Sequence, residues 1–317
     1  MRARLIVNPT ATGVTPALIE RVAAALAPVC QVERIATQRP GHARELAAES
    51  GCDLVVAMGG DGTANEVANG LPSGVPAGFL PAGASSVFAR QLGFPHHPLK
   101  AARLLAGAIA ADSVRPVGLG ELDGRLFTFA AGIGLDAEAI RRVEQARTRR
   151  GGRGRPGDLR VVAAALAGLA RDGFTLPERM TVAGAGGRVR AGYLAVANQH
   201  PYTYFGRLAV RVAPRASFAT GLDVVAVAAL RRRDLWRLPV YALLWPRHAT
   251  AGDSRVAYLH DVDLVEVTCD RPLPAQIDGE YLGLVERCRI AYRPGAISVF
   301  VPPVASGPGR EPAAADR

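Results

Sequence analysis

The stretch from Leu54 to Val67 carries the strongest chemical signal in this chain. An apolar, β-branched run ends at Gly59-Gly60-Asp61-Gly62, and a helix-compatible stretch begins at Thr63. Backbone N–H groups in such a turn, with the positive end of a helix dipole behind them, suit a phosphate, and glycines let the backbone come close to it. Asp61 places a carboxylate beside this anion site. That placement makes sense if a Mg²⁺ ion or a hydroxyl with a proton to lose is also bound there.

Four further segments combine turn residues with groups that can do chemistry. Each alone is more often structural, but together and in this order they form a specific pattern. The Asn8–Gly13 turn and the turn in residues 81–90 would lie at the same sheet edge as the Gly59–Thr63 turn. Three such turns together would form a nucleotide-binding cleft. The four are Asn8-Pro9-Thr10-Ala11-Thr12-Gly13, residues 81–90, Gly132-Ile133-Gly134-Leu135-Asp136-Ala137, and Gln276-Ile277-Asp278-Gly279-Glu280.

The first third of the chain must position these turns. Strand and helix signals alternate there, which predicts a parallel sheet covered by helices. Ligands of such sheets bind at the carboxyl ends of the strands, where the Gly59–Thr63 turn lies. The expected strands are 5–7, 29–35, 54–57 and 77–80, and the expected helices are 16–27, 42–49, 63–69, 85–92 and 99–110.

Strand-like runs dominate from residue 114 onward, and hairpin signals stand at Asp123-Gly124 and at residues 184–187. We therefore expect an α/β protein with a Rossmann-like parallel-sheet domain at 1–117, an antiparallel β-rich domain at 118–303 and a disordered tail at 304–317. The last strands of the second domain could pack back on the first. The expected strands are 114–119, 126–131, 180–183, 190–197, 208–212, 222–230, 262–268, 275–277, 288–292 and 297–301.

Composition narrows the classes of protein. The chain has 317 residues, of which 49% are hydrophobic and 21% charged, as in soluble globular proteins of about two domains. The net charge of +10 favours anionic partners such as a nucleotide, a phospholipid surface or a nucleic acid. Four scattered cysteines argue against a zinc site or a disulfide framework and fit a reducing cytosol. We expect neither a signal peptide nor a membrane span.

Two segments suggest a membrane surface as an alternative to an ordinary structural role. Residues 141–160 are rich in arginine, and we favour a solvated loop over a contact with an anionic membrane. Residues 235–245 are apolar and aromatic but too short to span a bilayer. A buried helix is the first interpretation of that stretch, and an interfacial or acyl-chain-binding element is the second.

The motifs together resemble the diacylglycerol kinase catalytic family, in the branch of bacterial lipid kinases and sphingosine-kinase-like enzymes. The similarity runs from residue 4 to about residue 303, and Gly59–Thr63 is its strongest element. The resemblance implies an active site between the two domains, with ATP and Mg²⁺ as cofactors and a lipid alcohol as acceptor. It also implies a cytoplasmic protein in peripheral contact with the inner face of the membrane. A homodimer is compatible with it, and a nucleic-acid partner is not expected.

The resemblance also implies roles for individual residues. Glu280 would accept the proton of the alcohol, Asp61 and Asp136 would organise magnesium and the lipid hydroxyl, and Asp278 is a further catalytic candidate. Carboxylate side chains suit phosphoryl transfer, which depends on the positioning of the substrates and on the neutralisation of charge. The expected nucleotide-binding residues are Asn8, Pro9, Thr10, Ala11, Thr12, Gly13, Thr37, Gly59, Gly60, Gly62, Thr63, Glu66, Gly83 and Ser85.

The chain departs from the family pattern at two places. The third nucleotide turn of the family reads Pro-x-Gly-Thr-x-Asn-Asp, whereas this chain has Ala84, Ser86 and Val87 at the last polar positions, so that Ser85 and Ser86 would have to supply hydroxyls. Some relatives hold a structural magnesium through an Asp-x-x-Leu-x-Asp pattern. Of that pattern Asp223 remains, while Phe218 and Gly221 occupy the other ligand positions. The metal candidates are therefore Asp61 and Asp223.

Three alternatives to a lipid kinase stay open. NAD kinases share a Gly-Gly-Asp-Gly turn, so a soluble-metabolite kinase is one. The altered 84–87 loop makes a non-catalytic nucleotide- or lipid-binding regulator another. A nucleic-acid binder would explain the net charge but not the carboxylate-bearing turns, and no basic motif with interleaved aromatics stands in the chain.

Overall fold

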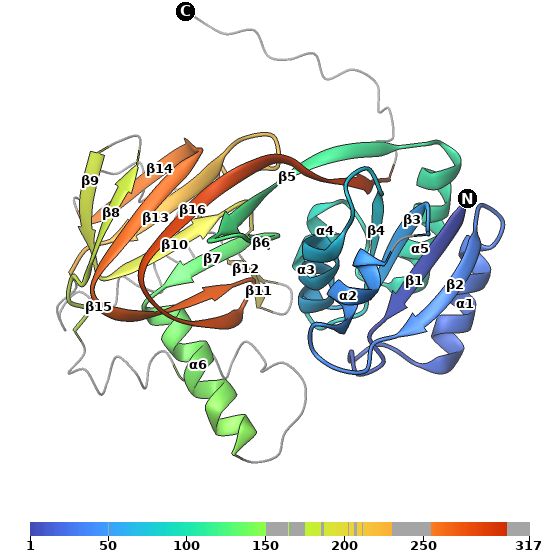
Figure 1. Cartoon of the computed structure of the whole chain (residues 1–317), viewed down its shortest axis with the longest axis horizontal. Helices are drawn as coiled ribbons and strands as arrows, with labels where there is room; N and C mark the ends of the chain where they lie inside the picture. Colours follow the sequence, from blue (N-terminus) through green and yellow to red (C-terminus); the bar gives the residue numbers. More distant parts are fainter. Residues whose placement is uncertain are drawn as a thin grey trace, which may run out of the picture.

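In the computed structural model the chain forms two lobes that lie side by side (Figure 1). The structure describes residues 1–49, 51–149, 164, 175–184, 187–201, 203–205, 208–210, 212–229 and 255–302. Residues 150–160 of the arginine-rich segment, the apolar stretch 235–245 and the expected tail at 304–317 lie outside the described residues.

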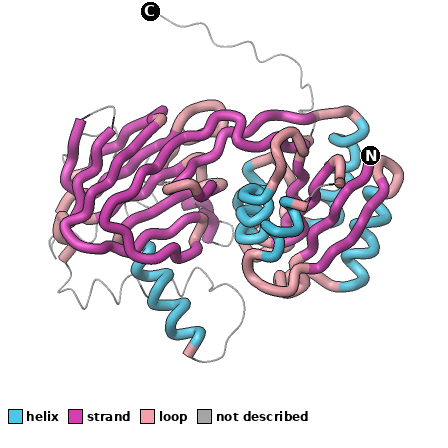
Figure 2. Tube along the Cα trace, viewed as in Figure 1, coloured by secondary structure: helices cyan, strands magenta, loops and turns pink. Residues whose placement is uncertain are grey.

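The N-terminal lobe is a parallel sheet with helices on both faces. The strand order is β2-β1-β3-β4, and β3 and β4 are buried along their whole length, as expected for the centre of a covered parallel sheet. Helix α1 packs with α5 on one side, and α2 packs with α3 on the other (Figure 2). The elements are β1 (Arg2–Val7), α1 (Pro16–Leu26), β2 (Gln31–Ala36), α2 (His42–Ala48), β3 (Leu54–Gly59), α3 (Asp61–Gly70), β4 (Ala77–Pro81), α4 (Val87–Gln91) and α5 (Pro98–Ala110).

Local chemistry explains where these helices begin. The hydroxyl of Thr15 accepts a hydrogen bond from Leu18 N at 3.2 Å, and Pro16 follows as the first helical residue of α1. Helix α3 begins at Asp61, directly after the glycine pair. Helix α4 begins two residues later than expected because Ser86 has a left-handed backbone conformation, with φ of 42°.

The C-terminal lobe is an antiparallel sheet with the strand order β14-β13-β10-β7-β15-β16, to which β5, β6, β8 and β9 are added at the sides. The prediction of a parallel α/β lobe followed by an antiparallel β-rich lobe is thus confirmed. The elements are β5 (Val114–Leu122), β6 (Arg125–Phe127), β7 (Ala130–Ile133), α6 (Leu135–Thr148), β8 (Met180–Gly184), β9 (Gly187–Ala191), β10 (Tyr193–Ala197), β11 (Thr203–Phe205), β12 (Leu208–Val210), β13 (Leu222–Val227), β14 (Val256–Val262), β15 (Leu264–Ile277) and β16 (Glu280–Phe300).

Strands β5 and β16 connect the two lobes. The two strands that we expected at 288–292 and 297–301 are one continuous strand, β16, which pairs with β5 on its way toward the N-terminal lobe. Near its end, Val299 pairs in parallel with Ala77 of β4, so one 14-stranded sheet runs through both lobes, and only β11 and β12 of the described strands form a separate pair. Strand β5 runs without a break through residue 117, where we placed the domain boundary.

Several local expectations were wrong. The strand expected at 190–197 is divided into β9 and β10, and the strands expected at 262–268 and 275–277 are one strand, β15. The described part of the arginine-rich segment is not a loop, because residues up to Thr148 belong to helix α6, where Glu138 forms ion pairs with Arg141 and Arg142 one turn away. The expected strand 126–131 is divided into β6 and β7. It breaks because the N–H groups of Thr128 and Phe129 donate to the carboxylate of Asp278 rather than to a neighbouring strand.

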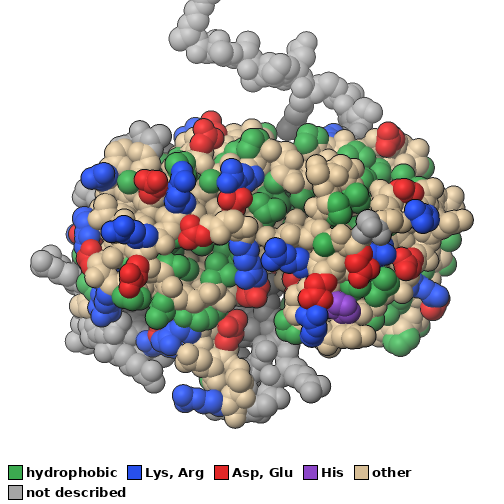
Figure 3. Space-filling view, in the orientation of Figure 1, with side chains coloured by type: hydrophobic (Ala, Val, Ile, Leu, Met, Phe, Trp, Pro, Cys, Tyr) green, Lys and Arg blue, Asp and Glu red, His purple; other side chains and the backbone are tan. Residues whose placement is uncertain are grey.

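On the face that Figure 3 shows, basic and acidic side chains are mixed over both lobes and do not gather into one large patch of a single charge. Within the described ranges, no helix combines the length and the apolar character needed to cross a lipid bilayer.

Candidate functional site

Three turns at the carboxyl ends of β1, β3 and β4 come together, as the sequence predicted. Gly13 N donates to Ala82 O at 3.1 Å, and Ala82 N donates to Gly59 O at 2.8 Å. The side-chain amide of Asn8 donates to the hydroxyl of Thr63 at 3.2 Å. The first turn is therefore hydrogen bonded to the second and to the third.

The glycines allow this close approach. A Cβ atom at position 83 would lie 2.6 Å from Gly60 Cα, and one at position 59 would lie 2.5 Å from the hydroxyl oxygen of Thr63. Both distances are shorter than real Cβ contacts, so the second and third turns pack backbone against backbone, and Gly59 makes room for the side chain of Thr63. Gly62 differs, because a Cβ atom there would have no other atom within 4 Å. Its surroundings leave room for a ligand to reach the backbone.

The first turn is held by its own asparagine. Asn8 Oδ1 accepts hydrogen bonds from the backbone N–H of Thr10 at 3.0 Å and from its hydroxyl at 2.8 Å. Pro9, Thr10 and Thr12 are exposed. The N–H of Thr37, at the end of β2, donates to the carbonyl of Val7 at 2.8 Å, which places Thr37 beside the start of this turn.

Asp61 joins the second turn to the third. Its side chain is buried, and Oδ1 accepts a hydrogen bond from Phe88 N at 3.0 Å at the start of α4, while Oδ2 accepts one from the hydroxyl of Ser85 at 3.3 Å. The hydroxyl of Ser86 bonds to the N–H and the carbonyl of Gly83. The two serines of the altered turn thus close it and fasten it to Asp61. This role of Asp61 was not foreseen, since it depends on a helix that begins 26 residues later.

His96 is a contact that the sequence did not reveal. It lies in the short segment between α4 and α5. Its Nε2 is 2.9 Å from the carbonyl oxygen of Gly83. The imidazole therefore supports the third turn from outside.

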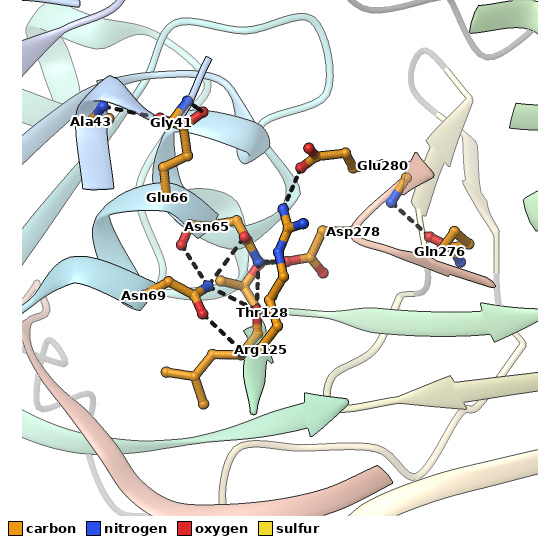
Figure 4. Close-up of polar contacts among 12 residues, drawn as sticks. Gly41, Ala43, Asn65, Glu66, Asn69, Arg125, Thr128, Gln276, Asp278 and Glu280 are labelled. Atoms are coloured by element: carbon orange, nitrogen blue, oxygen red, sulfur yellow. Dashed lines mark hydrogen bonds and ion pairs between the residues drawn. The ribbon is translucent and has the colours of Figure 1, made fainter. Parts of the chain in front are cut away.

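Glu66 is engaged with helix α2. Its two carboxylate oxygens accept hydrogen bonds from Gly41 N at 2.9 Å and Ala43 N at 3.0 Å, which cap the N-terminus of α2 (Figure 4). Among the described hydrogen bonds none joins Glu66 to the three turns. Its expected part in nucleotide binding stays a prediction.

Glu280 lies in the C-terminal lobe, at the first position of β16. Its side chain is 49% exposed, and Oε2 forms an ion pair with Nη2 of Arg125 at 2.7 Å. Asp278 and Gly279, with φ of 46° and 73°, form a two-residue hairpin turn in which Ile277 pairs with Glu280. The segment that we recognised by its two carboxylates is therefore a tight hairpin, with Glu280 directed outward.

Asp278 is enclosed. Its carboxylate accepts five hydrogen bonds, from the N–H groups of Thr128, Phe129 and Ala130, from the Thr128 hydroxyl and from the amide of Asn65. Burial raises the pKa of the Asp278 carboxyl above its usual value, while the backbone and hydroxyl donors act in the opposite direction. Its oxygens face protein donors and not a substrate site, so the structure does not give Asp278 the catalytic role that we expected.

Gln276 connects Asp136 to the same hairpin. Its amide nitrogen donates to Asp136 Oδ2 at 2.9 Å, and its amide oxygen accepts from Gly279 N at 2.8 Å. Asp136 Oδ1 also accepts from Ala137 N at 2.7 Å in the first turn of α6. A Cβ atom at position 132 would lie 2.2 Å from Asp136 Oδ2, so Gly132 makes room for this carboxylate.

Asp223, the second metal candidate, has protein partners in this structure. The carboxylate is fully buried, Oδ1 lies 2.6 Å from Nδ1 of His260, and Oδ2 accepts a hydrogen bond from the hydroxyl of Tyr258. Burial and the bond to Asp223 raise the pKa of the Tyr258 phenol. Phe218, at a former ligand position, instead packs edge-on against Phe88 with ring centroids 5.8 Å apart. Among the described residues, no further acidic, histidine or cysteine side chains complete a metal site around Asp223, and its part in binding a metal stays a prediction.

Magnesium at the nucleotide turns is a separate question. Within the part of the chain that the structure describes, no three acidic, histidine or cysteine side chains are grouped so that they could hold a metal. Mg²⁺ is often bound by only one or two carboxylates together with the phosphates of a nucleotide. The turns with Asp61 are compatible with an ion that arrives with its nucleotide.

Comparisons with known proteins agree with this arrangement. The family profile described as "Diacylglycerol kinase catalytic domain" matches residues 2–121, and the profile "YegS C-terminal NAD kinase beta sandwich-like domain" matches residues 130–301. A curated diacylglycerol kinase of Bacillus subtilis is 41% identical over 97 residues, which cover 29% of this chain and 31% of that protein. The chain thus spans about a third of the length of the first curated relatives that it matches.

Solved structures show the same fold. The crystal structure of a diacylglycerol kinase from Bacillus anthracis superposes with a TM-score of 0.70 over 95% of this chain and 97% of that chain, at 21% sequence identity. An NAD kinase from Archaeoglobus fulgidus, solved in complex with ATP, gives a TM-score of 0.50 at 14% identity, over 96% and 94% of the two chains.

Proposed function

The chain belongs to the diacylglycerol kinase catalytic family, in the branch with a YegS-type C-terminal domain, and we propose on that basis that it transfers the γ-phosphate of ATP to the hydroxyl of a membrane lipid alcohol. The acceptor would be of the diacylglycerol or long-chain-base type. The observation that carries the proposal is the packing of three glycine-containing turns at the carboxyl ends of β1, β3 and β4, with Gly83 against Gly60. Such turns bind phosphate groups through backbone N–H groups.

In this proposal the N-terminal lobe binds the nucleotide. The Gly59–Thr63 turn, at the start of α3, would hold the phosphates, with the Asn8–Gly13 turn and Thr37 beside it. Ser85 would act mainly by holding the third turn against Asp61. Magnesium would neutralise the phosphates and would be held by the nucleotide together with Asp61.

The C-terminal lobe would bring the acceptor. Glu280 would take the proton of the lipid hydroxyl as the hydroxyl oxygen forms its bond to the γ-phosphorus. The bond from that phosphorus to the bridging oxygen breaks, and ADP leaves. A half-exposed carboxylate suits this role because substrate can reach it, which is not so for Asp278. Asp136, tied to the hairpin by Gln276, would orient the lipid hydroxyl.

Peripheral membrane binding is part of the proposal, since the acceptor resides in a bilayer. It predicts that the protein binds vesicles that contain anionic lipids, and that binding weakens steeply with salt if residues 141–160 contribute. Salt-insensitive binding would point to the apolar stretch 235–245 instead.

A phosphotransfer assay tests the proposal. Purified protein would be incubated with Mg²⁺ and ATP labelled at the γ-position, and with a panel of lipid alcohols in mixed micelles, with NAD as a soluble acceptor in parallel. We expect label in at least one lipid and none in NADP. Label in NADP alone would favour a soluble-metabolite kinase. ATP binding without transfer to any acceptor would favour a non-catalytic regulator.

A further inference from the structure

One side of helix α3 carries three polar side chains spaced four residues apart, which we call the polar stripe. Residues at this spacing lie on the same side of an α-helix, one turn above the other. Each leaves the helix to contact a different segment of the chain. The stripe consists of Asp61, which caps α4, Asn65, which contacts Asp278, and Asn69, which contacts Leu126.

Asn65 and Asn69 of the polar stripe join α3 to the C-terminal lobe (Figure 4). Asn65 Nδ2 lies 2.8 Å from both Leu126 O and Asp278 Oδ2. Asn69 accepts from Leu126 N at 2.8 Å and donates to Leu126 O at 2.9 Å. The helix that begins at the nucleotide turn is therefore hydrogen bonded to β6 and to the hairpin that carries Glu280.

Asp278 is the anchor of that hairpin. Four of its five hydrogen bonds come from residues 128–130 of its own lobe, and the fifth comes from Asn65 across the junction. A buried carboxylate needs such donors, because the loss of one hydrogen bond inside the protein raises the free energy of the folded state. The position of the Asp278 carboxylate is thus fixed from both lobes at once.

The anchor also fixes Glu280. Only Gly279 separates the two acidic residues, and the turn that contains it is closed by the Ile277–Glu280 pair and by the bond from Gly279 N to Gln276 Oε1. A short, closed turn leaves the backbone of Glu280 little freedom relative to Asp278. Since Asp278 is bonded to α3, Glu280 has a fixed position relative to the turn at the start of that helix.

We propose that Asn65 and Asp278 form a latch that holds Glu280 in register with the Gly59–Thr63 turn. Neither side chain would touch the substrate, so both are positioning residues. This inference rests on the proposed role of Glu280 as the proton acceptor. Phosphoryl transfer depends on alignment, and a displacement of about 1 Å can lower the rate about 100-fold. The latch supplies alignment between two lobes that bind different substrates.

Asn65→Leu tests the latch, because it removes the amide and keeps a side chain of similar size. Asn69→Leu is the matched control: it removes hydrogen bonds from the same side of α3, including the one from Asn69 Nδ2 to Asn65 Oδ1 at 3.2 Å, but leaves every donor to Asp278 in place. We expect kcat to fall about 30- to 100-fold in Asn65→Leu and at most about threefold in Asn69→Leu, while the Kd for ATP changes by less than about twofold in both. The latch would be overturned if both variants lost the same factor in kcat and if this loss were in proportion to the decrease of their Tm.

Hydrogen–deuterium exchange supplies a readout that does not depend on activity. The N–H groups of residues 128–130 are bonded to Asp278 and should exchange faster in Asn65→Leu than in Asn69→Leu, while strand β10 stays protected in both. Unchanged protection of residues 128–130 in Asn65→Leu would contradict the latch. Failure of the wild-type protein to phosphorylate any lipid would instead contradict the proposed function and leave the exchange result standing.

Discussion

Glu280, the first residue of β16, and Arg125, the first residue of β6, form an ion pair, with Oε2 and Nη2 2.7 Å apart. Both side chains are partly exposed, and such pairs contribute at most about 1 kcal/mol to folding. The pair nevertheless fixes the direction of the Glu280 carboxylate.

Arg125→Gln should therefore impair the reaction more than the fold. We expect kcat/KM for phosphate transfer to fall about tenfold, a change of about 1.4 kcal/mol, because Glu280 loses the group that orients it. The Tm should change as little as in Arg34→Gln, which removes the exposed pair with Glu20 in the other lobe. Full activity of Arg125→Gln would show that the pair has no part in the site.

Gly83→Ala should weaken nucleotide binding. Its Cβ atom would lie 2.6 Å from Gly60 Cα, so the second and third turns must move apart. We expect the Kd for ATP, measured by calorimetry, to rise about tenfold, or about 1.4 kcal/mol. Gly107→Ala is the control, because a Cβ atom in that position of α5 would meet open space. Wild-type affinity in Gly83→Ala would mean that the third turn is not part of the nucleotide site.

These turns could be predicted because their signal is local. At the Gly59–Thr63 turn, the apolar run, the glycines and the start of the helix follow one another directly in the sequence. A glycine also indicates a position where the backbone makes a close contact that a side chain would block. The hairpin at Asp123-Gly124 was predictable for the same reason, and both residues have the positive φ that its turn type requires. The core strands of the N-terminal lobe followed from their uniform apolar character.

The contacts across the lobes could not be predicted in this way. Asn65 and Asp278 are 213 positions apart, and asparagine in a helix gives no sign of its partner. The break between β6 and β7 has the same cause, since the amides of residues 128–130 turn toward that distant carboxylate. The resemblance to the family made Asp278 a catalytic candidate, whereas its burial and its five hydrogen-bond donors indicate an anchor.

Helix α6 should lose stability in acid through Glu138. Burial acts to raise the pKa of Glu138, but hydrogen bonds from Arg141 and Arg142 outweigh it and hold the pKa below its usual value. Because the folded-state pKa is lower than the unfolded value of about 4.3, ionised Glu138 favours the folded state. This contribution is complete above that pH and is lost as the pH falls through the folded-state pKa.

Glu138→Gln isolates this effect. The difference in the free energy of unfolding between wild type and Glu138→Gln should be constant from pH 7 to about pH 5 and should shrink below about pH 4. Urea unfolding at a series of pH values measures it. A difference that grows on acidification would contradict the assignment of these ion pairs.

Removal of divalent metal should leave the fold intact. A bound structural ion at 100 times its Kd would add about 2.7 kcal/mol to stability, which EDTA would remove. We expect no change of Tm with EDTA in the absence of nucleotide, because His260 and Tyr258 already satisfy Asp223. His260→Phe should destabilise the protein by about 1–3 kcal/mol, since Asp223 then keeps a buried, unpaired oxygen. A drop in Tm with EDTA alone would show that a bound metal ion stabilises the fold and would favour Asp223 as one of its ligands.

The transfer of labelled γ-phosphate to the best lipid acceptor tests the role of Glu280 when wild type is compared with Glu280→Gln and Glu286→Gln, the last being an exposed glutamate on the same strand. If Glu280 accepts the proton of the lipid hydroxyl, Glu280→Gln should lower kcat by about 100- to 10,000-fold with little change in the Kd for ATP, whereas Glu286→Gln should behave like wild type. These results would establish this role. Wild-type turnover in Glu280→Gln would contradict it.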